Sequence, residues 1–128
     1  MKSGYMQTGV SALGVVAVVV AACGPEAKVG TAEVCTSAPS QAIANLNAVA
    51  EANEACSTDA DCTTIALGGS CFDACTRTVN QAGKGALDRA TVPIEAGPCK
   101  EFSAAHCEKV VPPCAPPSPP VCKEGRCQ

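Results

Sequence analysis

The chain has very few aromatic residues. It contains no tryptophan, one tyrosine and two phenylalanines among 128 residues. The tyrosine, Tyr5, lies near the amino terminus, so Phe72 and Phe102 are the only aromatic side chains after residue 22. Because aromatic and large aliphatic side chains provide most of the apolar area that a domain buries, a core built from this sequence is small. We therefore expect cross-links to supply much of the stability of the fold.

Charged residues of either sign are sparse, and they do not gather into runs. Nine lysines and arginines stand against twelve aspartates and glutamates, which gives a formal net charge of −3. The positive residues are scattered singly along the chain. Such a pattern argues against nucleic-acid binding and against adhesion to anionic lipid by charge alone.

The sequence also lacks the usual patterns of catalytic and metal sites. His106 is the single histidine, and its neighbour Cys107 would need a free thiolate and an orienting group to act as a nucleophile. No Cys-x-x-Cys occurs, which argues against a zinc ribbon and against dithiol redox chemistry. Asp59 and Asp61 resemble the start of a calcium loop, but the later glycine and glutamate of that motif are missing. We therefore expect no catalytic residue, no metal site and no cofactor.

Cysteine is the residue that is present in excess, with eleven in the chain. So high a content in a short chain is typical of a disulfide scaffold in an oxidising compartment. Cys23 stands apart near the amino terminus, and the other ten can all be joined in pairs. These ten are Cys35, Cys56, Cys62, Cys71, Cys75, Cys99, Cys107, Cys114, Cys122 and Cys127. Ten cysteines allow about 945 pairings, so their spacing does not define the connectivity.

The amino-terminal segment has the features of an export signal. Lys2 provides a positive start, and Val10 to Ala22 is an uncharged apolar run. Such a run is typical of a secretory signal and is short for a membrane span. Small residues at positions 20 and 22 also suit ordinary signal peptidase, which is the alternative to lipoprotein processing. Lipidation of Cys23 would leave an even number of cysteines to pair, whereas ordinary cleavage would leave one thiol unpaired.

The motif Val20-Ala21-Ala22-Cys23 resembles a bacterial lipobox. The resemblance implies a signal peptide over residues 1–22, lipidation of Cys23, and attachment to the membrane through that lipid. Gly24 resembles the residue that follows the cysteine in outer-membrane lipoproteins. We expect a tether over 23–36 and a cysteine-rich domain over 37–128.

Periodicity within this domain predicts a small disulfide-rich α+β fold, with two helices on a minimal antiparallel sheet. Ser37 is a suitable N-cap, Pro39 is tolerated in a first turn, and apolar residues at helical spacing follow to position 55. Alternating β-branched residues predict a strand over 63–67. A second helix is expected over 78–91, with Pro93 ending it.

The carboxyl-terminal part is predicted to lack helices beyond a short helical turn within 99–107. Residues 110–120 carry six prolines and are expected to be extended, either as a stiff strap or as a proline-rich recognition segment. Residues 121–127 predict a hairpin with a Glu124-Gly125 turn, which places Cys122 opposite Cys127. These two cysteines can bond each other or reach inward, and we expect at least one bridge from this tail to Cys62 or Cys56.

A set of loose motifs resembles small cysteine-rich lipoproteins of myxobacterial type. The resemblance covers most of residues 56–128, and it implies no defined activity. The motifs are Asp61-Cys62 with its strand, the Cys71 and Cys75 pair, Val79-Asn80, the proline run and Cys122-Lys123-Glu124-Gly125-Arg126-Cys127. We expect a non-catalytic lipoprotein of the bacterial cell envelope that acts as a binding or structural module. The alternative is a disulfide-braced inhibitor of an extracellular hydrolase.

Overall fold

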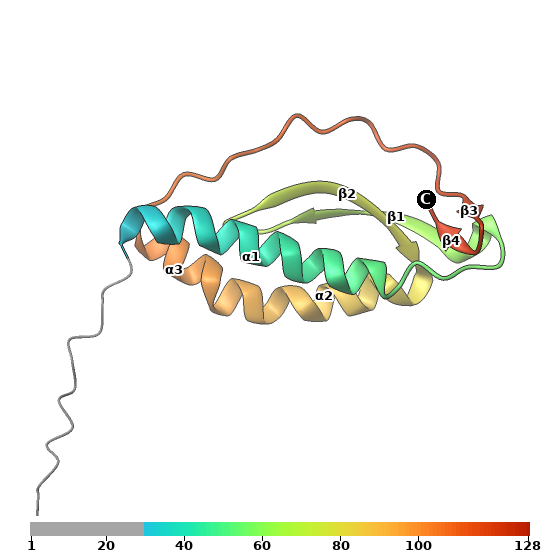
Figure 1. The fold of residues 1–128 in the computed structure, drawn as a ribbon, viewed down its shortest axis with the longest axis horizontal. Helices are drawn as coiled ribbons and strands as arrows, with labels where there is room; N and C mark the ends of the chain where they lie inside the picture. Colours follow the sequence, from blue (N-terminus) through green and yellow to red (C-terminus); the bar gives the residue numbers. More distant parts are fainter. Residues whose placement is uncertain (1–29) are drawn as a thin grey trace, which may run out of the picture.

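The computed structural model describes residues 30–128 (Figure 1). The expected signal peptide, the lipidation site at Cys23 and the first half of the expected tether, residues 23–29, lie outside the described residues. Helices α1 (Thr31–Glu51) and α2 (Gln81–Ala96) lie side by side, and a two-stranded sheet lies along one side of them. An extended segment arches from the end of α3 (Pro98–Ala104) over the sheet to a hairpin at the opposite end of the molecule.

Helix α1 (Thr31–Glu51) is longer than the sequence indicated. We expected it to start at Ser37, with Pro39 in the first turn, but it begins six residues earlier and Pro39 lies inside it. Tertiary contacts, which capping and periodicity in the sequence do not report, stabilise the first turns of α1. Ala38 is buried, α1 packs against α3 at this end, and Cys35 is cross-linked to Cys107. These tertiary contacts outweigh the one backbone hydrogen bond that Pro39 cannot make.

Strands β1 (Cys62–Gly68) and β2 (Asp73–Asn80) form the main antiparallel sheet. The strand predicted over 63–67 is confirmed. The ladder pairs Ala66 with Thr76 and Gly68 with Asp73, so Leu67 lies opposite two residues of β2. One of these two residues is Cys75, whose φ is 61°. This arrangement is a β-bulge, which bends β2 and redirects the Cys75 side chain.

Helix α2 (Gln81–Ala96) starts later and ends later than predicted. Residues 78–80 belong to β2 because Val79 is fully buried in the core between sheet and helices. The Asn80 side chain caps the helix by accepting a hydrogen bond from the Gly83 N–H at 2.9 Å. Pro93 does not stop the helix, which continues for three residues and buries Ile94.

Helix α3 (Pro98–Ala104) is the short helical turn expected within 99–107, and Pro98 stands in its first turn. Its buried residues are Cys99 and Phe102. Proline suits this position because the first helical N–H groups have no partner within the helix.

The carboxyl-terminal hairpin is confirmed, with strands β3 (Cys122–Lys123) and β4 (Arg126–Cys127). Glu124 and Gly125 both have positive φ values, 54° and 76°, as a two-residue type I′ turn requires. The hairpin is attached to the body of the protein by backbone hydrogen bonds. The Cys127 N–H donates to the Glu54 oxygen at 2.7 Å, and the Cys56 N–H donates to the Gly125 oxygen at 3.1 Å.

The core lies between the helices and the sheet and is small. Its largest fully buried side chains are Phe72, Leu46, Leu87 and Val79, together with Cys71 and Cys99. The α1 side of this core is lined mainly by small residues, with Leu46 between Ala42 and Ala50. The predicted class, a small disulfide-rich α+β fold, is confirmed, with a third short helix and a second small sheet added to it.

Candidate functional site

Five disulfides connect the ten cysteines of the described chain. They are Cys35–Cys107, Cys56–Cys122, Cys62–Cys127, Cys71–Cys99 and Cys75–Cys114. Four of them join the first half of the domain to residues 107–127. The fifth, Cys71–Cys99, joins the loop before β2 to α3. Residues 107–127 are therefore covalently fastened to the rest of the domain at four points.

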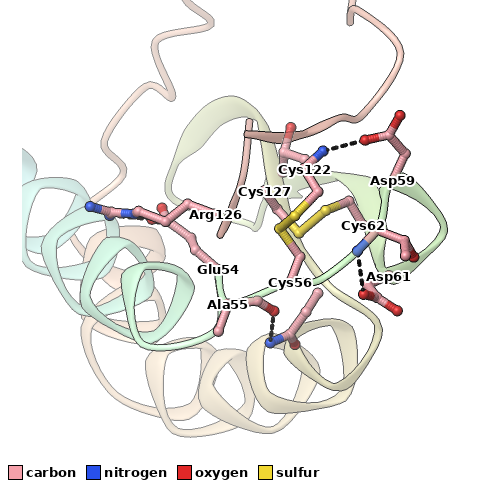
Figure 2. The surroundings of a disulfide bond; sticks show 12 residues. Glu54, Ala55, Cys56, Asp59, Asp61, Cys62, Cys122, Arg126 and Cys127 are labelled. Atoms are coloured by element: carbon pink, nitrogen blue, oxygen red, sulfur yellow. Dashed lines mark hydrogen bonds and ion pairs between the residues drawn. A yellow bond between two sulfur atoms is a disulfide. The ribbon is translucent and has the colours of Figure 1, made fainter. Parts of the chain in front are cut away.

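Two of these disulfides lie next to each other at the hairpin end (Figure 2). The Sγ atoms of Cys56, Cys62 and Cys127 are all within 4.8 Å of one another. Bonded as disulfides, these sulfurs offer no thiolate to a metal ion. The hairpin is thus held at both strands, by Cys122 to the loop after α1 and by Cys127 to the start of β1. The structure has bridges from the tail to both Cys56 and Cys62.

The acidic residues of the calcium-like motif contact backbone N–H groups at this same end. One Asp61 carboxylate oxygen accepts the N–H groups of Ser57 and Thr58, each at 2.8 Å. These bonds favour the charged form and hold the pKa of Asp61 below its usual value of 3.8. Asp59 accepts the Cys122 N–H at 2.6 Å, which fastens β3 (Figure 2). Both acids therefore order the loop that carries the paired disulfides.

Arg126 and Glu54 form an ion pair beside these disulfides (Figure 2). The Arg126 Nε donates to a Glu54 carboxylate oxygen at 3.0 Å, and its Nη2 donates to the same oxygen. This contact raises the pKa of Arg126. The pair joins β4 to the end of α1, alongside the backbone bond from Cys127 to Glu54.

Residues 108–121, which we call the strap, form the exposed part of this framework. They have no helix or strand and run from α3 to the hairpin (Figure 1). The strap is bounded by Cys107 and Cys122, and Cys114 fastens its middle to β2. Its apolar residues face solvent: Val110 is 80% exposed and Val111 is 64% exposed. A segment with these properties can contact another molecule without a change in the fold.

A small cavity of about 210 Å³ lies beneath the first part of the strap. Residues of α1, the start of β2 with the loop before it, α3 and the strap line it. Its apolar lining includes Ile43, Phe72, Phe102 and Val110, and Asp73 and Glu108 add two acids. This cavity could not be predicted from the sequence because its walls come from residues 35–43, 71–73 and 102–112, which are far apart in the chain.

Cys107 of the candidate Cys–His pair cannot act as a nucleophile while it is in a disulfide. Cys107 is bonded to Cys35, so no thiolate is present there. His106 is exposed and has a positive φ of 55°, at the point where the chain leaves α3 for the strap.

No protein-family model matches the chain, and no curated protein or solved structure matches it either. Within residues 30–128, no helix is both long enough and apolar enough to cross a membrane. The structure itself therefore defines the class, which is a small disulfide-rich α+β protein.

Proposed function

We propose that this protein is a non-catalytic lipoprotein of the bacterial cell envelope that binds another macromolecule through its strap. The single observation that supports this proposal best is the state of residues 108–121. They are exposed along almost their whole length, yet disulfides hold them at both ends and in the middle.

This combination favours binding because the strap is ordered before it meets a partner. A free segment of this length would lose much conformational freedom on association. Proline fixes φ, and the three cross-links restrict the segment further. Val110, Val111 and Val121 supply apolar contact area that is solvent-exposed in the isolated chain.

The lipobox-like motif supports membrane attachment at the opposite end from the hairpin. Seven residues separate Cys23 from Thr31, and they span at most about 25 Å when fully extended. A lipid on Cys23 would thus hold the start of α1 near the bilayer. The hairpin lies at the far end of α1, a helix of 21 residues and about 30 Å. The strap would run from the membrane-facing end to the outer end.

A fatty-acid labelling experiment tests the anchor. The full-length protein is expressed in a Gram-negative host that is fed an alkyne-bearing fatty acid. We expect the wild type to take up the label and to partition with detergent, and Cys23→Ser to lose both properties. Ser37→Ala, a change of similar size outside the motif, should keep them. A labelled Cys23→Ser protein would refute the proposed anchor.

Photo-cross-linking in intact cells tests the strap as the binding surface. A photoreactive amino acid replaces Ser118, which is exposed in the strap, or Ala48, which is exposed on α1. We expect discrete cross-linked products from position 118 and none from position 48. Equal yields at the two positions would show that the strap has no special role.

Inhibition of an extracellular hydrolase is the second candidate function, and the same strap favours it. The stretch between Cys114 and Cys122 is a disulfide-bracketed, exposed segment of the kind that can enter an active-site cleft in an extended form. The purified full-length protein is assayed against trypsin-like, chymotrypsin-like and subtilisin-like proteases. Inhibition that is lost when Ser118 and Val121 are both replaced by glycine would favour this function.

A further inference from the structure

The outer edge of β1 has no partner strand in residues 30–128. The main sheet contains only β1 and β2, and the hairpin forms a separate sheet. Loop, cap and side-chain hydrogen bonds within this part of the chain do not involve the backbone of β1 between Thr63 and Leu67. The outer side of β2 is different, because the Asn80 N–H donates to the Asn53 oxygen and the Arg77 side chain donates to Asn47.

The hydrogen-bond register shows which β1 groups point outward. In an antiparallel pair, alternate residues direct their N–H and C=O groups toward the partner, and the others direct them away. The Asn80 N–H points away from β1, and Asn80 pairs with Cys62. At the other end, the Gly69 N–H donates to the Phe72 oxygen, one position beyond the Gly68–Asp73 pair. Both observations place Thr64 and Ala66 among the residues whose backbone groups point outward.

This edge also lacks the features that usually protect an exposed strand. Natural sheets guard their edges with lysine, proline or an inward-pointing charge. The stretch Thr63-Thr64-Ile65-Ala66-Leu67 contains none of these. Its alternating β-branched and apolar residues suit pairing with a further strand.

A cavity of about 470 Å³ lies between this part of β1 and α2. Leu46, Leu67 and Leu87, which are almost completely buried, contribute to its lining. Lys84 and Asp88 also line it, and their side chains pair with each other at 3.0 Å. Because the two charges neutralise each other, the cavity carries no net charge, and about half of its surface is apolar. Its volume is within the range that accepts a side chain or a small ligand.

We propose that an extended peptide segment of a partner protein binds here as a third strand, with an apolar side chain in the cavity beside α2. This site is separate from the strap, whose residues do not line the cavity, so the proposal goes beyond the proposed function. The outward N–H and C=O groups of Thr64 and Ala66 match an extended backbone, which carries the same groups at the same spacing. Ile65 and Leu67 lie on the cavity side of β1, so the peptide residues that share their face point toward the cavity.

A peptide fits this site better than a second folded copy of the chain. The strand has seven residues, which is about 23 Å of edge. A stable dimer needs about 800 Å² from each partner, more than one short strand provides. A peptide needs only the edge and the cavity.

Peptide binding to the purified full-length protein tests the proposal. The probes are blocked, fluorescently labelled heptapeptides that alternate threonine with valine, leucine or phenylalanine, and binding is read as fluorescence anisotropy. We expect saturable binding by at least one of them, with a dissociation constant below about 1 mM. Two N-methylated versions of that peptide are compared, one methylated at the odd-numbered residues and one at the even-numbered residues. One of them should bind about tenfold more weakly than the unmethylated peptide, and the other should lose much less affinity.

Proline substitutions on the two edges provide a matched pair. Ala66→Pro removes an outward N–H of β1 and leaves the bonds to β2 intact, so it should weaken binding about tenfold. Thr78→Pro removes the equivalent outward N–H on β2, since Thr78 pairs with Thr64, and it should leave binding unchanged. Circular dichroism checks that both variants fold, and the methylated peptides give the same test on the wild type.

Three results would overturn the proposal. The first is no binding by any peptide at 1 mM, and the second is equal binding to the two proline variants. The third is a peptide-free dimer, seen by light scattering, that Ala66→Pro dissociates, which would assign the edge to a second copy. Each of these leaves the labelling at Cys23 and the cross-linking at Ser118 untouched, so failure here is distinguishable from failure of the proposed function.

Discussion

Cys114, in the middle of the strap, is bonded to Cys75, the residue of β2 whose backbone is left-handed at φ 61°. The bulge opposite Leu67 and the bridge to the strap are therefore the same feature of β2. The Asp73 carboxylate stabilises this turn of the backbone by accepting the Cys75 N–H at 3.0 Å. The strap is thus anchored at an irregular point of the sheet.

Removing this bridge should release the strap without unfolding the domain. Cys114 is exposed and Cys75 is half-buried. The double variant Cys75→Ser, Cys114→Ser therefore removes the bridge without creating a large cavity. Cys71→Ala with Cys99→Ala removes a bridge between two residues that are 1% and 0% exposed, and it adds the cost of a core cavity. We expect the second pair of changes to lower the melting temperature by about 10 °C or more beyond the first. Thermal unfolding followed by circular dichroism measures both, and equal losses would show that the core bridge has no added packing role.

The two glycines of α2 should respond in opposite ways to alanine. A Cβ at Gly83 would lie 2.8 Å from the Val79 Cβ and 2.9 Å from the Asn53 Cβ, so Gly83→Ala should destabilise the fold. A Cβ at Gly85 would meet only the end of the Arg89 side chain at 3.4 Å. Gly85→Ala should therefore stabilise the protein by about 0.5–1 kcal/mol, the usual gain in a helix. Melting temperatures of the two variants decide this, and a stable Gly83→Ala protein would contradict the close approach of α2 to Asn53.

Asp61 should make stability depend on pH only in the acid range. Its pKa is lower in the folded state than the usual 3.8, because the carboxylate accepts backbone bonds from Ser57 and Thr58. Such a group contributes stability that is complete above the unfolded-state pKa and is lost as the pH falls through the folded-state pKa. Asp61→Asn should therefore melt lower than the wild type at pH 5–7, and the difference should shrink below about pH 4.

Glu124, exposed in the hairpin turn, provides the control for this measurement. Glu124→Gln removes a carboxylate that makes no side-chain hydrogen bond in the described chain, so its effect should be small at every pH. If the difference between Asp61→Asn and the wild type stays constant down to pH 2.5, the charged hydrogen bonds of Asp61 do not stabilise the loop.

The sequence predicted those elements that depend on local patterns. The strand over 63–67 follows from alternation, and the hairpin follows from Glu124-Gly125 between two short runs. Both boundaries of α2 were wrong. Val79 has helical spacing with the residues after it, but burial against the helices makes it part of β2. Pro93 lies where the lost hydrogen bond is offset by the burial of Ile94.

Features that depend on contacts between distant segments could not be predicted from the sequence. The pairing of Cys71 with Cys99 depends on the approach of α3 to the loop before β2, which no spacing rule contains. The free edge of β1 and its cavity likewise require the register with β2 and the position of α2. The number of cysteines indicated cross-linking, but only the fold shows that four of the five cross-links end within residues 107–127.

Complete reduction should unfold the domain at room temperature. The core has seven large buried apolar side chains besides its cysteines, and disulfides typically contribute about 2–4 kcal/mol each. Since the free energy of unfolding of a domain is about 5–15 kcal/mol, the loss of five bridges, about 10–20 kcal/mol, is of the same size or larger. Circular dichroism before and after reduction in native buffer should show loss of the helical signal. A reduced protein that keeps its helices would show that the small core is sufficient.

The intact mass of the mature protein, extracted from membranes without reduction, tests the proposed lipoprotein most directly. We expect a chain that begins at Cys23, carries lipid on that residue, and weighs ten hydrogens less than the thiol form because five disulfides are present. A chain with an unmodified Cys23, or one that still carries the ten hydrogens, would contradict it.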